Sequence, residues 1–197
     1  MENKKLSKRD LNALTKASEE LHKQDSDYRR TANVEFVLFF ILVLTIALAI
    51  RMFVFEPVRV SGDSMYPTLH NGERMFVTKT DYWFEEPQRG DIIICYYPGE
   101  TQTCVKRIVG LPGDIVQVYN GAMHINNEIF DESEYWNGYI DSVTLPVSVP
   151  EGCVYVVGDN RNFSLDSRST DVGPIPYSSI VGKVRSVIWP IANYRDL

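Results

Sequence analysis

Three short segments of this sequence contain residues that can do chemistry. Residues 61–69 read SGDSMYPTL and place Ser64 among turn-forming residues. Residues 104–114 read CVKRIVGLPGD and place Lys106 inside an apolar, β-branched run, where an unpartnered ammonium would be costly to bury. Residues 158–168 read GDNRNFSLDSR, a stretch polar enough to form a hydrogen-bonded scaffold beside a site.

Each segment also has an ordinary structural interpretation. A serine next to glycine is common in turns, and residues 158–168 could form a hydrated loop. Lys106 could lie on the solvated face of a strand. Alternation along the strand does not decide this, because the faces that carry Lys106 and Arg107 both mix charged with apolar residues.

The composition excludes several classes of protein. The chain has 197 residues, enough for one folded domain with attachments, and its net charge of −6 gives no nucleic-acid-binding footprint. Three cysteines are too few for a disulfide-dense mini-fold. No Cys-x-x-Cys pair or histidine cluster offers a metal site, so we expect no metal. His22, His70 and His124 are scattered, which leaves few candidates for a Ser–His–Asp triad.

An apolar run divides the chain. Residues 1–33 are polar and carry eight Lys or Arg and six Asp or Glu. Residues 36–50 read FVLFFILVLTIALAI, and a helix of about 20 residues ending at Phe55 would span about 30 Å, the thickness of a bilayer core. We therefore expect a cytoplasmic N-terminal tail over residues 1–33, a transmembrane anchor over 34–55 and an extracytoplasmic domain over 56–197.

Two alternatives compete with an anchor, namely a buried helix of a soluble domain and a cleaved signal peptide. Ala47-Leu48-Ala49 has the small-x-small pattern of a cleavage site, but it lies inside the apolar run and follows too long a polar region. Arg29 and Arg30 precede the run, so the positive-inside rule favours a cytoplasmic N-terminus. The polar region has a partial helical stripe, which fits a docking helix, a solvated helix or a disordered tail.

After residue 56 the pattern changes to short β-branched runs separated by Gly and Pro turns. No ten-residue helical stretch interrupts them, so we predict an all-β domain with a mainly antiparallel sheet. Asn120-Gly121 is the strongest hairpin signal, because Asn-Gly suits a type I′ turn. The runs cover residues 74–78, 91–97, 103–110, 114–119, 123–130, 153–158 and 180–189.

Two further features have open interpretations. Cys95 and Cys104 flank YYPGETQT symmetrically, so a tight hairpin would place them opposite each other, as a cross-strand disulfide or as two free thiols. Cys153 is expected to be unpaired. The aromatic residues 82–84 (YWF) could lie in a membrane interface or in the core.

Taken together, the segments resemble the type I signal peptidases, membrane-anchored serine endopeptidases that remove signal peptides from exported proteins. The resemblance covers roughly residues 34–190, and four motifs in one order behind a membrane span make it specific. A single span with a short domain is similar to the compact Gram-positive form. The motifs are Ser-Met-x-Pro-Thr-Leu from Ser64, Arg-Gly-Asp-Ile from Arg89, Lys-Arg-x-x-Gly-Leu-Pro-Gly-Asp from Lys106 and Gly-Asp-Asn-Arg-x-x-Ser-x-Asp-Ser-Arg from Gly158.

The resemblance implies a Ser–Lys dyad that needs no metal or cofactor. Ser64 matches the nucleophile and Lys106 matches its general base. An ordinary lysine, with a pKa of about 10.4, is protonated at neutral pH and cannot accept a proton. Desolvation among apolar residues would lower that pKa and would explain why Lys106 lies beside Val105, Ile108 and Val109.

The third segment matches the family's supporting residues. Ser164 matches a serine that hydrogen-bonds and orients the lysine. Asp166 and Arg168 match a neighbouring ion pair, and Asp159 and Arg161 belong to the same scaffold.

The resemblance also implies an oxyanion hole. The Ser64 backbone N–H would supply one donor. Gly62 occupies the position from which some members supply a second donor through a serine hydroxyl, so a backbone N–H or a water would have to replace it.

The family cleaves after small residues at −3 and −1. This implies shallow apolar pockets in a groove where the signal peptide lies extended, as a strand added to a sheet edge. The positions that match pocket-lining residues are Val60, Met65, Leu69, Met75, Cys104 and Val105.

The resemblance thus predicts a signal peptidase I on the outer face of a bacterial cell membrane, as a single-pass type II protein. Its expected partners are signal peptides of secreted preproteins, the lipid bilayer and the secretion translocon, with no nucleic acid. One alternative is a self-cleaving repressor-type Ser–Lys protease, which the membrane span and residues 158–168 oppose. Another is a non-catalytic homologue that binds substrates, for instance in surface-fibre assembly, which the intact Ser64 and Lys106 oppose.

Overall fold

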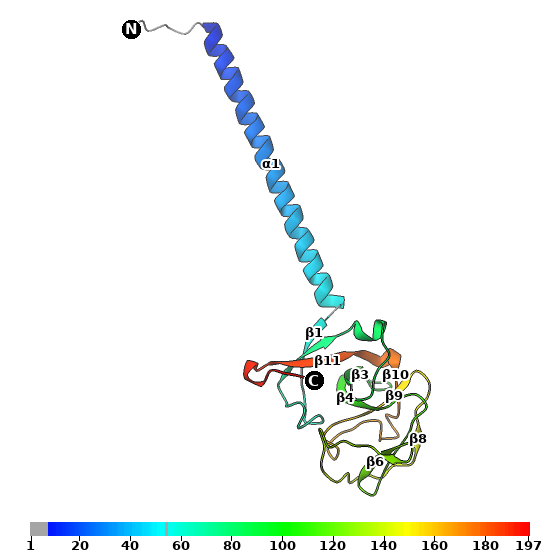
Figure 1. Ribbon diagram of the computed structural model, residues 1–197. Helices are drawn as coiled ribbons and strands as arrows, with labels where there is room; N and C mark the ends of the chain where they lie inside the picture. The colour runs from blue at the N-terminus through cyan, green and yellow to red at the C-terminus, as the bar shows by residue number, and fades with distance from the viewer. Residues whose placement is uncertain (1–7, 54) are drawn as a thin grey trace. The chain divides into compact units, whose positions relative to one another are not determined.

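The computed structural model describes residues 8–53 and 55–197, and the chain divides near residue 50 into a helix and a β domain. Helix α1 runs from Lys8 to Phe53 (Figure 1). The polar N-terminal region and the apolar run are therefore parts of one helix over the described residues. Residues 1–7 of the expected tail and Val54 of the expected anchor lie outside them.

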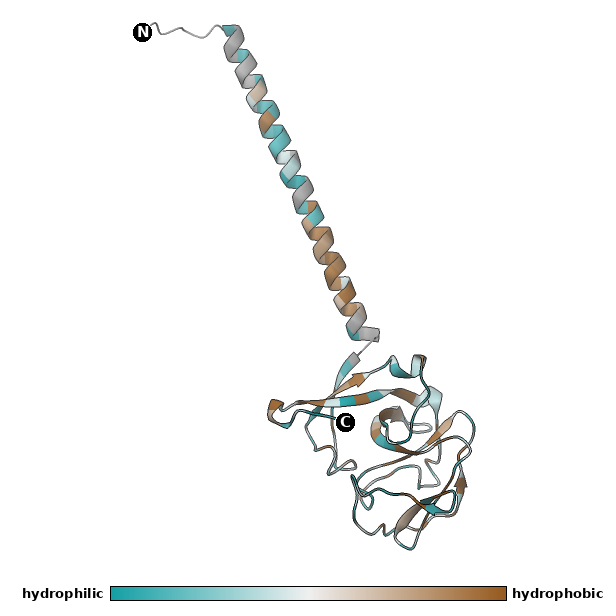
Figure 2. Ribbon diagram, in the orientation of Figure 1, coloured by the Kyte–Doolittle hydropathy of each residue, from teal (hydrophilic) through white to brown (hydrophobic). Residues whose placement is uncertain are grey.

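The second half of α1 is apolar (Figure 2). The most apolar 18-residue window within Lys16–Ala49 has a mean hydropathy of 2.4, and none of that window is buried. Among the described residues, α1 is the one helix that is long and apolar enough to cross a membrane, judged by length and composition. This is consistent with a membrane anchor.

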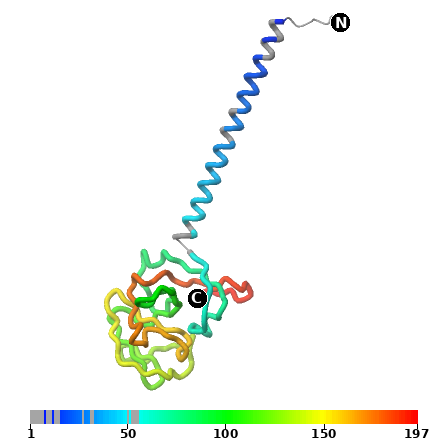
Figure 3. The backbone as a smooth tube through the Cα atoms, turned by 180° about the vertical axis from the view of Figure 1, so that it is seen from behind, coloured from blue at the N-terminus to red at the C-terminus, as the bar shows by residue number. Residues whose placement is uncertain are grey.

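Over residues 55–197, the β domain is built from short strands and three single-turn 3-10 helices (Figure 1). Figure 3 shows the path of its backbone from behind. The strands are β1 (Phe55–Arg59), β2 (Arg74–Thr78), β3 (Ile92–Tyr96), β4 (Thr103–Gly110), β5 (Ile115–Tyr119), β6 (Ala122–Ile125), β7 (Glu128–Ile129), β8 (Val147–Ser148), β9 (Cys153–Val157), β10 (Ile175–Pro176), β11 (Ile180–Trp189) and β12 (Arg195–Asp196). The 3-10 helices are η1 (Asp81–Trp83), η2 (Tyr177–Ser179) and η3 (Ile191–Asn193).

The strands form two antiparallel sheets. The larger sheet has the order β1-β2-β11-β3-β4-β9-β10, with β12 added beside β11. The smaller sheet has the order β7-β6-β5-β8. The predicted all-β, mainly antiparallel fold is confirmed, and each of the seven predicted runs contains a strand.

Two hairpins follow the sequence pattern. Asn120 and Gly121 have φ angles of 50° and 77°, both left-handed as a type I′ turn requires. Cys95 lies opposite Cys104 in the β3–β4 register, as their symmetric spacing predicted. Their sulfur atoms lie 3.5 Å apart, and both residues are free thiols, as is Cys153. Of the two interpretations of Cys95 and Cys104, the structure therefore shows free thiols and not a disulfide.

The exposed aromatic residues after β2 lie outside the core. Trp83 is 62% exposed and Phe84 is 87% exposed. Tyr82 is partly buried, and its hydroxyl donates to Asp91 Oδ2 at 2.9 Å. The core interpretation of this cluster is therefore wrong for Trp83 and Phe84.

The central strands β3 and β4 are packed between two apolar clusters. Ile94 of β3 packs in one cluster with Val60 and Met65. The preceding residue, Ile93, points to the opposite face and packs in another cluster with Ile108 of β4. Buried strands of this kind hold their backbone in place from both faces, so the segment of β4 that carries Lys106 has a rigid support.

The packing of β4 gives a direct test of the fold. Ile108→Ala should lower the free energy of unfolding by about 2–5 kcal/mol, because Ile108 is fully buried and its truncation leaves a cavity. Ile115→Ala is the matched control, since Ile115 of β5 is 45% exposed and should cost under about 1 kcal/mol. Urea unfolding of the full chain in detergent measures both; equal losses would contradict this packing.

Candidate active site

Ser64 lies in a turn that two buried side chains fix to the core. The turn follows β1, and Leu69 N–H donates to Met65 O at 2.9 Å. Met65 is 2% exposed and Leu69 is fully buried. Between these anchors and β1, Gly62 adopts a φ of +91°, a conformation that favours glycine, and its N–H donates to Asn71 Oδ1 at 3.2 Å.

Lys106 lies in β4, opposite Ile93 of β3, with a side chain only 3% exposed. Its Nζ is 2.9 Å from Ser64 Oγ and 2.9 Å from the carbonyl oxygen of Val105. The fold therefore brings together two residues that are 42 positions apart in the chain.

Burial lowers the pKa of the Lys106 ammonium from its usual value. Cys104, Asp166 and Asp159 oppose the shift, because negative charge nearby favours the protonated form. The net direction is downward, so the amine loses its proton more easily than a solvated lysine does.

Ser164 lies beside the dyad without the hydrogen bond to Lys106 that the family resemblance implied. Its Oγ donates to the carbonyl oxygen of Leu165 at 3.4 Å, whereas Lys106 Nζ bonds to Ser64 and Val105. The expected Ser164–Lys106 contact is therefore replaced by one within the Ser164 loop.

Gly158 explains how the two segments come so close. A Cβ atom at Gly158 would lie 2.4 Å from the carbonyl oxygen of Ser64 and 2.2 Å from Ser164 Oγ. Next to it, Asn160 N–H donates to that same Ser64 carbonyl at 3.0 Å. A side chain at Gly158 would push the Ser64 turn away, and sequence reasoning had not singled this glycine out as a site residue.

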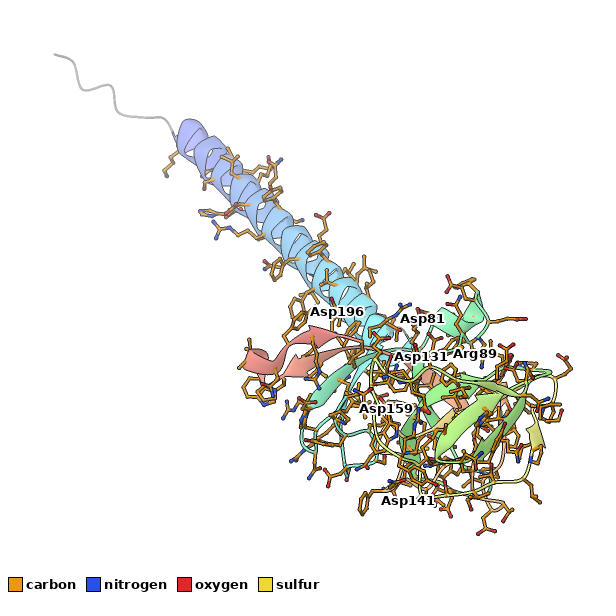
Figure 4. The ribbon with its side chains drawn as sticks, turned by 60° about the horizontal axis from the view of Figure 1, so that its bottom comes forward. Asp81, Arg89, Asp131, Asp141, Asp159 and Asp196 are labelled. Atoms are coloured by element: carbon orange, nitrogen blue, oxygen red, sulfur yellow. The ribbon has the colours of Figure 1, made fainter. Side chains whose placement is uncertain are left out.

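Asp159 connects the Ser64 turn to β4. It is fully buried, and Figure 4 places it well inside the β domain. Its carboxylate accepts two hydrogen bonds from Arg107, at 2.8 and 2.9 Å, and one from the Thr68 hydroxyl at 2.6 Å. Arg107 follows Lys106 and Thr68 belongs to the Ser64 turn, so one carboxylate ties both members of the dyad together.

Asp166 and Arg168 form a second bidentate ion pair, with Arg168 Nε and Nη2 donating at 2.8 and 2.7 Å. Asp166 Oδ2 also accepts the Gly158 N–H at 3.0 Å. The pair therefore fixes the loop on which Gly158 and Ser164 lie.

Arg161 has its partner in a segment that the sequence motifs did not include. It is 1% exposed and pairs with Glu132, whose carboxyl pKa burial raises, although Arg161 opposes this. Tyr135 lies nearby with its ring centroid 5.5 Å from the Arg161 guanidinium and 4.1 Å from that of Arg107. The Tyr135 ring, which contacts both guanidinium groups, joins the scaffold to the connection after β7.

The C-terminal strand braces the Ser64 turn from its other end. Arg195 donates to both carboxylate oxygens of Glu73, at 2.9 and 2.7 Å, and to the carbonyl oxygen of Thr68 at 2.6 Å. Glu73 is 3% exposed, and Arg195 lowers its pKa against the raising effect of burial. We call this contact the C-terminal brace.

A cavity of about 320 Å³ opens beside the dyad, and we call it the first cavity. Ser64 and Lys106 line it together with four of the six predicted pocket residues. Leu69 and Met75 do not line it; both are fully buried in the core cluster beneath. The four predicted residues that line it are Val60, Met65, Cys104 and Val105, and unpredicted lining residues include Val58, Ile94, Tyr97 and Leu165.

In the part of the chain that the structure describes, no group of three His, Cys, Asp or Glu side chains is placed to hold a metal ion. A buried amine 2.9 Å from a serine hydroxyl can activate that serine for attack on a carbonyl carbon. The site thus has the parts of a serine hydrolase.

A family model described as "Signal peptidase, peptidase S26" matches residues 33–189. The chain belongs to this signal peptidase family. It is 37% identical to signal peptidase I of Bacillus licheniformis over 181 residues, which cover 87% of this chain and 97% of the relative. It is 40% identical to signal peptidase I T of Bacillus subtilis (strain 168) over 167 residues, which cover 79% and 85%. A solved signal peptidase I from Enterococcus faecalis matches with 31% identity and a TM-score of 0.42, over 50% of this chain and 97% of that one.

The buried amine makes the stability of this signal peptidase depend on pH. Because burial lowers the folded-state pKa of Lys106 below its usual value of 10.5, the unfolded chain binds the extra proton between the two pKa values. Stability contributed by this group therefore rises with pH across that window. The free energy of unfolding of the wild type, relative to Lys106→Met, should increase accordingly. Urea unfolding of both proteins over a pH series measures this, and parallel curves would contradict a lowered pKa.

Proposed function

We propose that this chain is a membrane-anchored serine endopeptidase that removes N-terminal signal peptides from exported preproteins. Ser64 is the nucleophile and Lys106 is its general base. The observation that carries the proposal is the 2.9 Å contact between Lys106 Nζ and Ser64 Oγ, at a lysine that is only 3% exposed. Membership of the signal peptidase family supports the substrate class.

The burial of Lys106 supports its role as the base. In the neutral form, the amine has a lone pair that can accept the Ser64 hydroxyl proton, and the oxygen then attacks the carbonyl carbon of the scissile bond. The ammonium formed in this step can return the proton to the leaving amine. A water activated by the same amine would then hydrolyse the acyl-enzyme.

The charge that develops on the carbonyl oxygen needs donors. Among the described residues, the Ser64 N–H makes no hydrogen bond within the protein, so it is available as one oxyanion donor. Gly62 has no side-chain donor, and its N–H already donates to Asn71. A water is therefore our candidate for the second donor.

Two open strand edges support an extended substrate. In the described part of the chain, β1 pairs on one edge only, with β2. The β4–β9 pairing begins at Arg107, which leaves residues 103–105 open on the edge away from β3. A signal peptide can add a strand here, and its small side chains at −1 and −3 would enter the first cavity between Met65, Cys104 and Val105.

The supporting residues have positioning roles in this proposal. Asp159 holds Arg107 and Thr68, and Asp166 with Arg168 holds the loop of Gly158 and Ser164. Together they keep the Ser64 hydroxyl within reach of the amine. Arg161 supports the same loop from the side of Glu132.

The apolar half of α1 is the proposed anchor in the lipid bilayer. The N-terminus would lie in the cytoplasm and the β domain on the outer face of a bacterial cell membrane, where preproteins emerge from the translocon. The exposed Trp83 and Phe84 suit contact with the membrane interface.

Catalysis by the dyad predicts different activities for two charge-conserving substitutions, Lys106→Arg and Lys183→Arg. Lys106→Arg should reduce kcat for preprotein cleavage by at least about a thousandfold, because a guanidinium stays protonated and cannot act as the base. Lys106→Met and Ser64→Ala should be equally inactive. Lys183→Arg is the control, since Lys183 forms an ion pair with Asp91 that an arginine can also make, so this variant should keep its activity. Cleavage is measured on purified full-length protein, with folding checked by circular dichroism. Substantial cleavage by folded Lys106→Arg would remove Lys106 as the base.

The proposed topology is tested with intact cells whose wall has been removed. Protease added outside should digest residues 56–197 and leave a membrane-protected fragment that contains the N-terminus. Immunoblots against a tag at each end of the chain distinguish the fragments. A β domain that is digested only after the membrane is lysed would overturn the orientation.

A further inference from the structure

A second cavity, of about 430 Å³, continues the groove beyond the first. The two cavities share four lining residues, Val58, Ile94, Gln102 and Thr103. Neither Ser64 nor Lys106 lines the second cavity. It therefore lies farther along the groove from the dyad than the first cavity does.

The second cavity has an apolar floor. Val77, Ile94 and Val181 come from β2, β3 and β11, which are neighbouring strands of the larger sheet. Val77 and Ile94 are 1% and 2% exposed, and Val181 packs against the same core cluster. A floor of branched aliphatic side chains favours an apolar ligand over a polar one.

The rim of the second cavity is polar but electrically balanced. It includes Thr101, Gln102 and Thr103 of the β3–β4 hairpin and Glu56 of β1, all of which are exposed. The Glu56 carboxylate is 2.9 Å from Lys79 Nζ, so each charge already has a partner. The cavity therefore offers no unpaired charge to a charged side chain.

The walls of this cavity are parts of the strands that the proposed substrate would join. Glu56 and Val58 belong to β1, whose outer edge is open, and Thr103 begins the open edge of β4. Side chains at every second position of an extended peptide point to the same side, about 6.6 Å apart. If the side chains at −1 and −3 occupy the first cavity, the next side chain on that side is the one at −5.

On this basis, and resting on the proposed function, we infer that the second cavity is a substrate-binding site for the side chain at −5. It receives one side chain in about 430 Å³, whereas the first cavity shares about 320 Å³ between two. It therefore selects a large aliphatic or aromatic residue such as Leu or Phe, next to positions where only small residues fit.

The test compares kcat/KM for two preproteins that differ only at −5, with Leu in one and Ala in the other. The full-length wild type in detergent should prefer Leu by about tenfold. Val181→Phe fills the floor and should bring the Leu-to-Ala ratio to about one. Val181→Ala enlarges the cavity and should move the preference toward Phe at −5. Val143→Phe is the matched control, because Val143 is 76% exposed and lines neither cavity, and it should keep the wild-type ratio.

The outcomes separate this inference from the proposed function. A wild type that cleaves both preproteins with equal kcat/KM overturns the −5 site but not the peptidase activity. A Leu-to-Ala ratio that is unchanged in both Val181 variants has the same consequence. A preference at −4 or −6 instead of −5 overturns the assigned position. A wild type that cleaves neither preprotein overturns the proposed function itself. Thermal melts of each variant show that the ratios come from folded protein.

Discussion

The burial of one amine is the constraint on which the rest of this structure depends. Removing an ammonium from water costs several kcal/mol unless a partner compensates it or the proton leaves. At Lys106 the neighbours are a serine hydroxyl and a carbonyl oxygen, which are weaker partners than a carboxylate. The amine is therefore held in a state that favours proton loss, and its burial lowers the stability of the folded state. The apolar clusters on either side of β3 and β4 supply the stability that this requires.

The carboxylates around the site lie close to Lys106 but form their hydrogen bonds with other groups. Asp159 is occupied by Arg107 and Thr68, and Asp166 by Arg168 and the Gly158 N–H. Either carboxylate, if bonded directly to the amine, would stabilise the ammonium and raise its pKa. The paired arginines thus let the site use carboxylates as structural ties without making the base too strongly protonated. The pairing of each carboxylate with an arginine explains why charged residues surround a lysine that must lose its own charge.

Much of the fold could be predicted from the sequence because strands and turns depend on local patterns, whereas the dyad was implied by the family resemblance, since its members are 42 positions apart. Alternating β-branched runs predicted the strands, Asn120-Gly121 predicted its turn, and the spacing of Cys95 and Cys104 predicted their register. The remainder depends on contacts between distant segments. The family resemblance implied that Leu69 and Met75 line the substrate pocket, but a sequence does not distinguish an apolar residue beside a site from one beneath it. The Ser164 contact, the partner of Arg161 and the need for Gly158 depend on side-chain directions in loops, which no periodicity encodes.

The C-terminal brace has a consequence for the order in which the active site is completed. A chain is synthesised from its N-terminus, and 127 residues separate Thr68 from Arg195. The Ser64 turn is therefore synthesised early. Arg195, which stabilises it, is synthesised only after most of the β domain. Until Arg195 has been synthesised, Glu73 lacks the guanidinium with which it pairs in the folded domain. The C-terminal brace can therefore form only after nearly all of the β domain has been synthesised, and only Asp196 and Leu197 would separate Arg195 from a tag fused directly after Leu197.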